Sequence, residues 1–479
     1  MEDGTQFFFK GIAYQQGIGE AGKTSSSNTD FSDPLADAEK CKRDVPILKS
    51  LDTNVIRTYA IDPTADHSEC MSLLQDAGIY VVSDLGQPKL SINRNTPKWD
   101  VELFTRYKGV VDNLSKYSNV IGFFAGNEVS NSLNTTNASA FVKAAVRDTK
   151  KYIKDKGYKK SVGYAADDDA KVRDNIIKYF NCGPTEESID FFGYNVYEWC
   201  GHSSFAESGY NRILDTFKDY SVPVFFAEYG CNKNGGAKAR LFEETPALYV
   251  QNMSETLSGG IVYEYFQEEN DFGLVKESGN SVSKLADFAT LQKQIKNVDP
   301  KGVTMSKYTP SNKAQSCPTL DDQWASSTDL PPTPNADACS CMAKAVSCAV
   351  RDSTDKEDYG KIFGYICGRP GNLCAEITAN STSGKYGAYS GCAAKDQLSY
   401  VLDAYYKSQN NAADACSFKG MAGTQSASGS LSSCKKVVDS GSSGNGSDTE
   451  NAAPGSARAG ALWGASLVAG LIGAGVMAL

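Results

Sequence analysis

Eight short apolar runs, separated by longer amphipathic stretches, occupy the first 295 residues of this 479-residue chain. The runs have the length of buried strands, and the stretches between them have the 3.6-residue period of helices that bury one face. Eight such strand–helix units close into an α/β fold, the (β/α)8 TIM barrel. The predicted strands are Phe7 to Tyr14, Asn54 to Tyr59, Ile79 to Asp84, Val120 to Gly126, Ser161 to Ala165, Phe191 to Tyr197, Val224 to Ala227 and Gly260 to Tyr265. The predicted helices include Asp37 to Leu51, Ser68 to Asp76, Val101 to Tyr117 and Ala138 to Lys156.

Two of these predicted strands end in a glutamate. Glu128 follows the apolar run 119–126, and Glu228 follows the run Val222 to Ala227. An acid in such a position is costly to bury unless it has a chemical role. The hundred residues between the two acids allow about three βα units of at least ~30 residues each. The acids are therefore expected on the fourth and seventh strands.

Two carboxyl groups in one barrel suggest the cleavage of sugar acetals. Cleavage with retention needs carboxyls about 5–5.5 Å apart, one donating a proton and one attacking the anomeric carbon. Asn127, immediately before Glu128, could hold the sugar 2-hydroxyl. Taken singly, an Asn-Glu pair after a strand is more often a helix-capping turn. The two acids together favour glycoside chemistry.

Further polar residues follow the predicted strands at the ends where barrel active sites form. They are Tyr14, Gln15, Arg57, Thr58, Tyr59, Asp84, Asn195, Tyr197, Tyr229 and Tyr263. Side chains alternate between the two faces of a strand, so Asn195 and Tyr197 share one face and Glu198 points to the other. Glu264 likewise opposes Tyr263. We therefore expect Glu198 and Glu264 in structural ion pairs.

The composition excludes several other functions. The chain has 57 acidic and 48 basic residues, a net charge of −9, and no basic run that could follow a phosphate backbone. Nucleic acid is therefore not an expected partner. The only histidines are His67 and His202, too few for a histidine-rich metal site or a Ser/His/Asp triad. We expect both to be plain surface or loop residues, and we expect no metal and no cofactor.

Fourteen cysteines, none in a CxxC pair, point to an oxidising compartment. Six glycosylation sequons support secretion: Asn113, Asn134, Asn137, Asn252, Asn380 and Asn445. Residues 1–10 lack the charged and apolar regions of a signal peptide. Because the first predicted strand begins at Phe7, we expect that a signal peptide precedes this start in the natural chain.

Eight of the cysteines lie between Cys339 and Cys434. Such density predicts a small, disulfide-rich, mostly α-helical module at residues 336–436, whose connectivity the sequence leaves open. Five tyrosines there could stack on sugars or pack the small core: Tyr386, Tyr389, Tyr400, Tyr405 and Tyr406. A linker at residues 296–335 precedes the module and carries the stiff segment Pro331 to Pro334. The other six cysteines could form three bridges, with Cys317 tying the linker to the barrel.

The C-terminal end has the pattern of a GPI-anchor signal. A Ser/Gly-rich stalk at residues 437–451 is followed by small residues, a spacer and an uncharged tail from Ala461 to Leu479. Asn451 is the best attachment site, and residues 452–479 would be removed. A tail-anchor helix is the alternative. The Gly and Ala content of the tail and the absence of positive residues after it favour GPI.

Several strings together resemble one known family. They are Phe8-Phe-Lys-Gly-Ile-Ala-Tyr-Gln15, Arg57-Thr-Tyr59, Gly126-Asn-Glu128, Tyr194-Asn-Val-Tyr-Glu-Trp-Cys-Gly201, Phe226-Ala-Glu-Tyr-Gly230 and Tyr263-Glu-Tyr-Phe-Gln-Glu-Glu269. The chain resembles the GPI-anchored β-1,3-glucanosyltransferases of fungal cell walls, glycoside hydrolase family 72. The cysteine-rich segment resembles the carbohydrate-binding module of family 43. The likeness covers nearly the whole chain, with the signal peptide as the main departure.

This resemblance implies a retaining enzyme that cleaves an internal β-1,3-glucan linkage and passes the new reducing end to the non-reducing end of another glucan. Glu128 would be the acid/base and Glu228 the nucleophile. The donor site would be lined by Gln15, Tyr59, Asp84, Asn127, Tyr197 and Tyr263. The implied disulfides are Cys41–Cys70, Cys182–Cys317 and Cys200–Cys231.

The implied partners are a β-1,3-glucan donor, a glucan acceptor and, through the GPI anchor, the outer face of the plasma membrane at the cell wall. Two alternatives remain. One is a retaining endo-β-glucanase or mannanase with the same barrel, because two acids on strands four and seven serve many substrates. The other is an inactive wall-binding protein that uses the module as a lectin. The intact acid pair argues against the latter.

Overall fold

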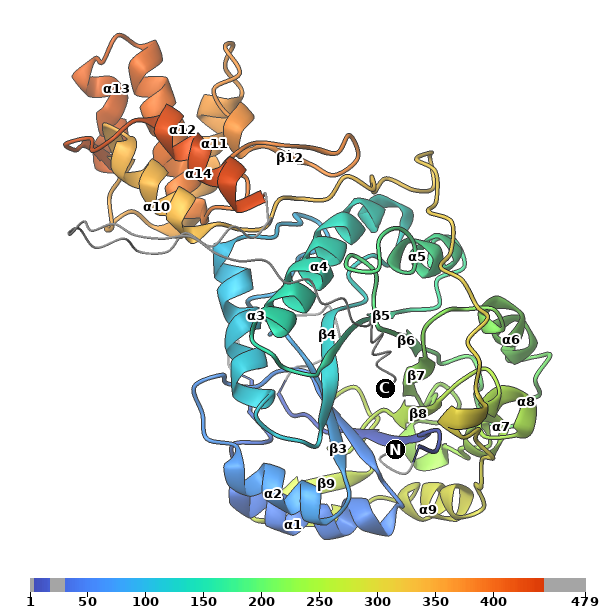
Figure 1. Cartoon of the computed structure of the whole chain (residues 1–479). Coiled ribbons are helices and arrows are strands. Elements are labelled where there is room, and N and C mark those ends of the chain that lie inside the picture. Colours follow the sequence, from blue (N-terminus) through green and yellow to red (C-terminus); the bar gives the residue numbers. More distant parts are fainter. Residues whose placement is uncertain (1–3, 18–30, 443–479) are drawn as a thin grey trace, which may run out of the picture.

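The computed structural model describes residues 4–17 and 31–442 and contains a closed barrel of eight parallel strands (Figure 1). The strands are β1 (Phe9–Ala13), β2 (Val55–Thr58), β3 (Tyr80–Asp84), β4 (Val120–Asn127), β5 (Ser161–Ala166), β6 (Phe191–Asn195), β7 (Val224–Tyr229) and β8 (Gly259–Val262). Each strand pairs with the next, and β8 pairs with β1 to close the ring. The predicted barrel is confirmed, with the two acids at the ends of β4 and β7.

Helices surround the barrel on its outside (Figure 1). They are α1 (Ala38–Ser50), α2 (Ser68–Asp76), α3 (Val101–Leu114), α4 (Ser139–Asp155), α5 (Arg173–Phe180), α6 (Tyr210–Phe217), α7 (Glu244–Leu248), α8 (Gln251–Ser254) and α9 (Phe288–Lys296). Asp37 and Asp100 cap α1 and α3, because their carboxylates accept the free backbone N–H groups of the first turn. Small differences from the predicted bounds lie at element ends, where the backbone leaves the regular ladder.

The barrel interior is a packed core and not a pore. Rings from four strands fill it: Phe9 lies 4.2 Å from Phe225 between ring centroids, and Phe124 lies 5.1 Å from Phe191. Glycine is required next to these rings. A Cβ on Gly163 would lie 2.3 Å from the Phe191 ring. Ligand chemistry is therefore confined to the polar ends of the strands.

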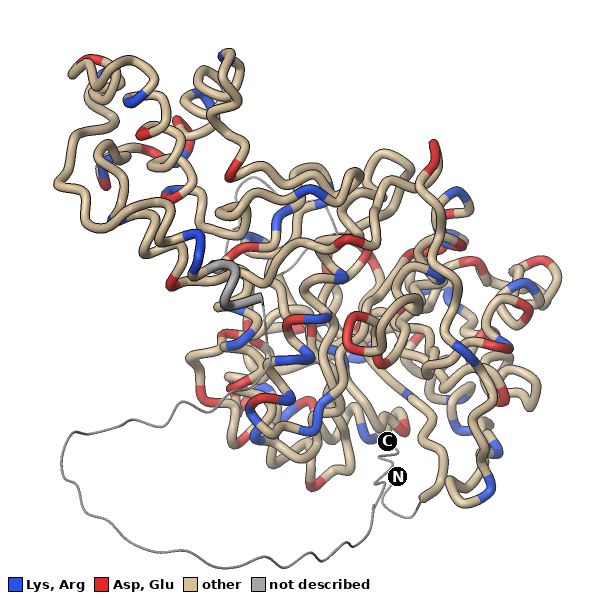
Figure 2. The backbone as a smooth tube through the Cα atoms, turned by 45° about the horizontal axis from the view of Figure 1, so that its top comes forward, with Lys and Arg blue, Asp and Glu red and all other residues tan. Residues whose placement is uncertain are grey.

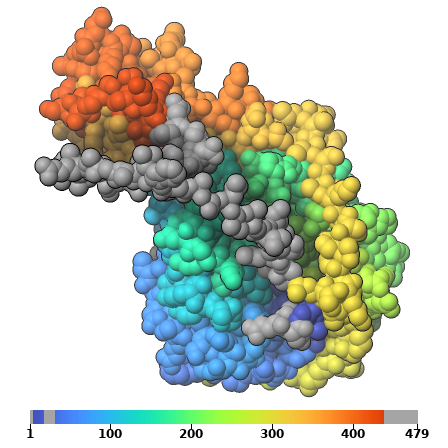
Figure 3. Space-filling view, in the orientation of Figure 1, coloured from blue at the N-terminus to red at the C-terminus, as the bar shows by residue number. Residues whose placement is uncertain are grey.

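After β8 the chain forms a hairpin of β9 (Val275–Ser278) and β10 (Ser281–Lys284) and, after α9, runs along the outside of the barrel. This segment, yellow in Figures 1 and 3, passes the α5 and α6 side. The disulfide Cys182–Cys317 fastens it, and the buried Trp324 packs 5.0 Å from Tyr179 between ring centroids. The linker is thus part of the barrel surface for much of its length.

The cysteine-rich module lies beyond α3 and α4 and is mostly helical, as predicted (Figures 1 and 3). Its elements are α10 (Ala336–Ala345), β11 (Cys348–Val350), α11 (Lys356–Cys367), β12 (Ala379–Asn380), β13 (Lys385–Tyr386), α12 (Ala394–Ser408), α13 (Ala413–Ser417), β14 (Ala422–Thr424) and α14 (Leu431–Ser442). Four disulfides hold it: Cys339–Cys392, Cys341–Cys434, Cys348–Cys416 and Cys367–Cys374.

The tyrosines of the module pack its core or its contact with the barrel. Tyr389 is fully buried and donates to the Leu431 carbonyl at 3.1 Å. Tyr386 lies with its ring centroid 6.4 Å from that of Phe141 in α4. The Gly391 carbonyl accepts the Val101 N–H at 3.0 Å, so the module also contacts the start of α3. Of the two interpretations of the tyrosines, the structure favours packing for these two.

Charged residues of both signs are interspersed along the barrel and the module (Figure 2). In the part of the chain that the structure describes, no helix is both long and apolar enough to cross a membrane. Nor do any three His, Cys, Asp or Glu side chains of residues 4–17 and 31–442 gather as a candidate metal site. The predicted stalk beyond residue 442, Asn451 and the tail lie outside the described residues.

Candidate active site

One buried arginine, Arg57 at the end of β2, organises the mouth of the barrel. Its Nε and Nη2 donate to the two carboxylate oxygens of Asp84 on β3, each at 3.0 Å. Its Nη1 donates to Glu228 Oε1 at 3.2 Å, and its Nη2 donates to Asn127 Oδ1 at 3.0 Å. The Arg57 side chain is 0% exposed. A single cation thus joins the ends of β2, β3, β4 and β7.

Glu228 receives hydrogen bonds on both carboxylate oxygens. The Tyr59 hydroxyl donates to Oε1 at 2.9 Å and the Tyr197 hydroxyl to Oε2 at 2.8 Å. Burial raises the pKa of Glu228 to about 7; the positive charge of Arg57 opposes this rise, repulsion from Glu128 adds to it, and the two phenol donors oppose it. Donors to a carboxylate favour its ionised form, which is the form that can attack carbon.

Glu128 stands on a tight turn just after β4. Its φ of 49° lies in the left-handed region, which costs a non-glycine residue on the order of 1–3 kcal/mol and persists only where neighbours hold it. The Glu128 N–H donates to the Ala165 carbonyl at 2.8 Å, and Arg94 Nη2 donates to the Glu128 carbonyl at 2.7 Å. Asn195 Nδ2 donates to Glu128 Oε1 at 2.8 Å. The carboxyl is thereby fixed from β6.

The two acids are linked by a continuous set of contacts. Asn195 Nδ2 donates to Asn127 Oδ1 at 3.0 Å as well as to Glu128, and Arg57 bonds both Asn127 and Glu228. Repulsion from Glu128 contributes to the raised pKa of Glu228. The mouth therefore holds two carboxyl groups in one set of hydrogen bonds, and retaining glycoside chemistry uses such a pair.

Two of the residues predicted to bind the substrate, Gln15 and Asp84, form hydrogen bonds with other groups of the protein. Gln15 Oε1 accepts the N–H groups of Tyr59 and Ala60, each at 3.0 Å, and Gln15 Nε2 donates to the Ser32 carbonyl at 2.7 Å. Asp84 is held by both nitrogens of Arg57. Gln15 therefore fixes the loop that carries Tyr59, and Asp84 fixes the guanidinium group of Arg57.

Aromatic rings form one wall of the site. Tyr263, which is partly exposed, lies edge-on to Tyr59 and Tyr197, with ring centroids 6.1 and 6.4 Å away, and Phe272 lies 5.3 Å from Tyr263. Sugar rings present C–H faces that pack against such surfaces. The predicted residues Tyr59, Tyr197 and Tyr263 thus come together around Glu228.

The expectation of ion pairs for Glu198 and Glu264 is wrong. Glu198 is exposed, and neither glutamate has an ion pair within the described residues. Glu264 is 3% exposed and accepts from Asn270 Nδ2 at 2.8 Å; burial raises its pKa to about 8. The sequence argument failed because β6 ends at Asn195 and β8 at Val262, so strand alternation no longer governs the residues beyond them.

Sequence reasoning also missed several residues of the site. Arg94, in the loop after β3, carried no signal, because only tertiary contacts bring it to the Glu128 carbonyl. Three consecutive aspartates, residues 167–169, follow β5. Because polar residues at strand ends mark the active site of a barrel, these aspartates could have been included among the candidates. Arg57 was noted among the polar strand ends, but its contacts with both Asp84 and Glu228 could not be foreseen.

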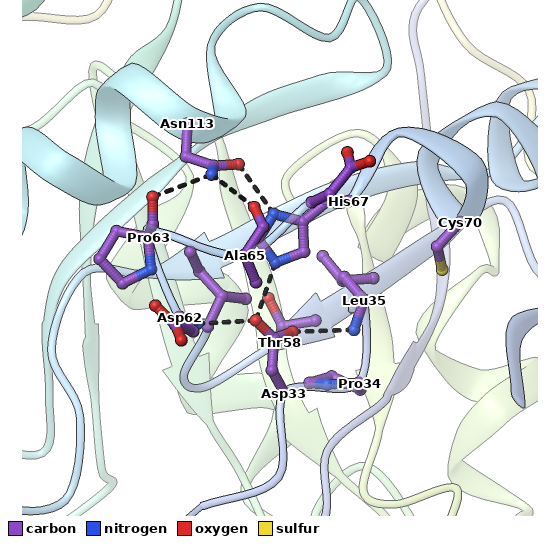
Figure 4. A network of polar contacts seen from close by, with 12 residues as sticks. Asp33, Pro34, Leu35, Thr58, Asp62, Pro63, Ala65, His67, Cys70 and Asn113 are labelled. Carbon is purple, nitrogen blue, oxygen red and sulfur yellow. Dashed lines mark hydrogen bonds and ion pairs between the residues drawn. The ribbon is translucent and has the colours of Figure 1, made fainter. Parts of the chain in front are cut away.

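His67 lies in the loop before α2, as expected, but it is not a plain surface residue (Figure 4). The His67 ring is buried, with Nε2 2.8 Å from Asp33 Oδ2 and Nδ1 2.8 Å from Asn113 Oδ1. The Asn113 amide also donates to the carbonyls of Pro63 and Ala65, each at 3.0 Å. These contacts tie the loops after β1 and β2 to α3. His202, in contrast, is 85% exposed.

Replacing His67 by glutamine should destabilise the protein mainly at acid pH. Burial opposes protonation of His67, but the hydrogen bond and charge of Asp33 outweigh it and raise the pKa. A raised pKa contributes stability that is fully present below the unfolded value of about 6.5 and is lost as pH rises through the folded value. The melting temperature of His67→Gln, relative to the parent, should therefore fall more at pH 5.5 than at pH 8.5. An equal fall at both values would assign the effect to packing, and His202→Gln is the control.

A surface hollow of about 490 Å³ adjoins these loops. Its lining is Phe31, Asp33, Asp62, Pro63, Gln87, Pro88, Lys89 and Arg106. Apart from Arg106 in α3, these residues lie in the loops that follow β1, β2 and β3, which continue from Gln15, Tyr59 and Asp84. A ring, amide and carboxylates beside one another are groups that can contact sugar rings and hydroxyls.

The sequence matches two family models. Residues 1–299 match the model described as glucanosyltransferase, of glycoside hydrolase family 72, and residues 346–423 match the X8 domain. A 1,3-beta-glucanosyltransferase of Arthroderma benhamiae is 54% identical over 459 residues, which is 95% of this chain and 83% of that protein. The 1,3-beta-glucanosyltransferase gas1 of Schizosaccharomyces pombe is 45% identical over 440 residues, 91% of this chain and 79% of that protein.

Solved structures show the same fold. Saccharomyces cerevisiae Gas2p in complex with laminaripentaose has a TM-score of 0.81 to this chain at 41% identity, covering 88% of this chain and 94% of that one. A Gas2p complex with laminaritriose and laminaritetraose has a TM-score of 0.78 at 42% identity, covering 85% and 90%. Both neighbours were therefore solved with β-1,3-linked oligosaccharides.

Proposed function

The chain belongs to glycoside hydrolase family 72, the glucanosyltransferases, and on this premise we propose a residue-level mechanism for its activity. It is a 1,3-β-glucanosyltransferase. The observation that carries the mechanism is the pair of interacting carboxyls, Glu128 and Glu228, joined through Arg57, Asn127 and Asn195. Glu228 is the nucleophile and Glu128 the acid/base.

In the first step Glu228 attacks the anomeric carbon of an internal β-1,3 linkage. The C–O bond breaks, and Glu128 gives its proton to the departing glucan oxygen. The glucan piece that carries the original non-reducing end stays attached to Glu228 as an ester, and the other piece leaves with a new hydroxyl. Tyr59 and Tyr197 hold the attacking carboxylate in place through its two oxygens.

In the second step Glu128 acts as the base. It takes the proton from the 3-hydroxyl at the non-reducing end of an acceptor glucan, and that oxygen displaces Glu228 from the anomeric carbon. Two displacements restore the β configuration and lengthen the acceptor. Water in place of the acceptor would give hydrolysis. Aromatic faces such as Tyr263 favour a sugar over water at the mouth.

Other expected donor-site residues act in this scheme through the contacts described above. Asn127 accepts from Arg57 and Asn195, and Tyr263 packs edge-on against Tyr59 and Tyr197. Gln15 and Asp84 position Tyr59 and Arg57. The hollow is lined in part by Asp62 and Pro63, which follow Tyr59 in the loop after β2, and we propose that it receives further units of a glucan.

We place the protein outside the cell. Seven disulfides within the described residues suit an oxidising compartment. The proposed organisation is a catalytic barrel at residues 1–295, a linker at 296–335, the cysteine-rich module at 336–436 and a stalk at 437–451. The module's last helix, α14, runs on to Ser442, so it includes the first six residues predicted as stalk. Asn451 would carry a GPI anchor that holds the enzyme at the outer face of the plasma membrane beside the wall.

Product analysis tests the transferase against the hydrolase. The enzyme is incubated with a laminari-oligosaccharide whose reducing end is reduced, and the products are sized by mass spectrometry. Products longer than the starting chain, in proportions that rise with acceptor concentration, are expected. Only shorter products at every acceptor concentration would make the protein an endo-glucanase.

A further inference from the structure

A chain of hydrogen bonds with a fixed direction runs from Arg57 to Glu128. Arg57 Nη2 donates to Asn127 Oδ1 at 3.0 Å, and Asn195 Nδ2 donates to the same oxygen at 3.0 Å. The second hydrogen of Asn195 Nδ2 goes to Glu128 Oε1, at 2.8 Å. Arg57 and Asn195 are both buried. The direction of these bonds decides which oxygen of the acid/base can carry a proton.

The identity of each atom in this chain follows from the atom before it. A guanidinium group has N–H donors and no acceptor, so the Asn127 atom that faces Arg57 must be the amide oxygen. The Asn195 atom that faces this oxygen must in turn be the amide nitrogen. A flipped Asn195 amide would set its oxygen against Asn127 Oδ1 with no hydrogen between the two acceptors. Asn195 is therefore held as a donor towards Glu128.

This orientation of Asn195 leaves its other amide atom unsatisfied. Asn195 Oδ1 is buried and has no hydrogen-bond partner in the part of the chain that the structure describes. A buried polar atom without a partner is unfavourable and calls for an explanation. The explanation here is the amide nitrogen, because both of its hydrogens are used in the active site. The Asn195 amide is thus placed for its nitrogen.

Asn195 joins the strands of the two acids. It is the last residue of β6 and lies opposite Glu228 in the register of β6 and β7. The next N–H, that of Val196, donates to the Glu228 carbonyl at 2.9 Å. The Asn195 side chain instead reaches Glu128, just after β4. The barrel therefore fixes the Asn195 backbone beside the nucleophile and its amide against the acid/base.

We propose that Asn195 is a positioning residue that keeps the transferable proton of the acid/base on Glu128 Oε2. The inference rests on the proposed role of Glu128 as acid/base. A neutral carboxyl has one oxygen that bears hydrogen and one that only accepts. Because Asn195 points a hydrogen at Oε1, Oε1 must accept and the proton lies on Oε2. No described residue bonds Oε2, and Glu128 is partly exposed, so this oxygen is the one available to a glucan.

The same oxygen then serves both steps of the reaction. In the first step the Oε2–H bond breaks as the proton passes to the glycosidic oxygen, whose bond to the anomeric carbon breaks while the Glu228 ester forms. In the second step the ionised Oε2 takes the proton of the acceptor 3-hydroxyl as that oxygen displaces Glu228. Glu128 Oε1 accepts from Asn195 throughout. No group of the site has to turn between the steps, which is the meaning of preorganisation.

The test compares two donors, a laminari-oligosaccharide and the corresponding β-fluoride, whose fluoride leaves without a proton. Asn195→Leu removes the amide donor, keeps roughly the size of the side chain and adds no charge. Because general acid catalysis is worth about 10²–10⁴-fold, kcat/KM on the oligosaccharide should fall about 10–100-fold. The fluoride should be affected far less, so the ratio of the two kcat/KM values should fall at least about tenfold. This ratio does not depend on how much of the enzyme is folded.

Asn119→Leu is a matched control. Asn119 is also a buried asparagine, and it precedes β4 at the opposite end of the barrel. Its Nδ2 also makes two bonds, to the carbonyls of Met71 and Ile79, and its Oδ1 likewise has no partner among the described residues. Its loss should lower both kcat/KM values equally. A parental ratio in Asn195→Leu would overturn the proposal, and Asn195→Ala decides in the same way if Asn195→Leu does not fold.

The Glu128→Gln variant separates this inference from the mechanism on which it rests. It should lose cleavage of the oligosaccharide far more than cleavage of the fluoride, because only the former needs the proton of Glu128. If Glu128→Gln retains cleavage of the oligosaccharide, the proposed mechanism fails. If Glu128→Gln behaves as expected but the Asn195 variant loses equal activity on both donors, the mechanism stands and the role of Asn195 is wrong.

Discussion

The Glu228→Gln variant will lose about 10⁴-fold or more in kcat/KM on laminari-oligosaccharides, because it replaces the proposed nucleophilic carboxylate with an amide that cannot form the covalent intermediate. Glutamine keeps the size of the side chain. Its oxygen can accept from Tyr59 and Arg57, and its amide nitrogen can donate to the Tyr197 hydroxyl, which now donates to Glu228. Arg57 keeps its paired contact with Asp84. The loss should therefore fall on the chemical step and not on folding.

The measurement is kcat/KM from product formation, beside a melting curve of the same preparation. Glu244→Gln is a matched control, because Glu244 in α7 is also a buried glutamate whose pKa burial raises to about 7, and it makes no contact with the acid pair. It should retain the parental kcat/KM. Parental activity in Glu228→Gln would remove the nucleophile assignment, and equal losses in both variants would point to a general effect of losing a buried acid.

Removing Arg57 should have the second large effect, on stability and on pH dependence together. Arg57→Leu leaves Asp84 and Glu228 buried without their cation, and breaking a buried pair in this way typically costs about 3–5 kcal/mol. The melting temperature should fall accordingly. The pH dependence of the remaining kcat/KM should also shift, because the Arg57 charge lowers the pKa of Glu228.

The acid limb of the Arg57→Leu pH profile should move to higher pH. Glu228 must be ionised to attack, so a higher pKa moves the acid limb of the kcat/KM profile to higher pH. Arg57→Lys retains the positive charge but not the planar set of donors. Its acid limb should lie between those of Arg57→Leu and the parent, and its melting temperature should recover to a smaller extent. An Arg57→Leu/Asp84→Asn double variant should be more stable than Arg57→Leu alone, since it removes one stranded charge. A parental acid limb in Arg57→Leu would contradict the role of Arg57.

The fold was largely predictable from local pattern. Each apolar run became a strand because burial on both faces selects continuous apolar residues, and the ends shifted by only a few residues. The cap Asp37 likewise sits where the helix pattern begins. Prediction was weakest past the strand ends, as for Glu264, where the period-2 alternation no longer applies.

The two acids of the active site were predictable, but the hydrogen bonds and ion pairs that join them were not. Glu128 and Glu228 stand out because a carboxyl closes each apolar run. Arg94 does not, because only tertiary contacts bring it to the Glu128 carbonyl. The burial of His67 was missed for the same reason, since the loops that cover it are far apart in the sequence.

The sequence by itself determined eight strands, their order, a disulfide-rich module and which two acids close strands four and seven. Those features follow from periodicity and composition, which act over a few residues. Only the tertiary structure decided that Arg57 joins Asn127, 70 residues away, to Glu228, 171 residues away, and that Arg94 reaches the Glu128 carbonyl. Such partnerships exist only once the barrel closes, because closure brings the ends of distant strands to one rim and removes water from between their charges.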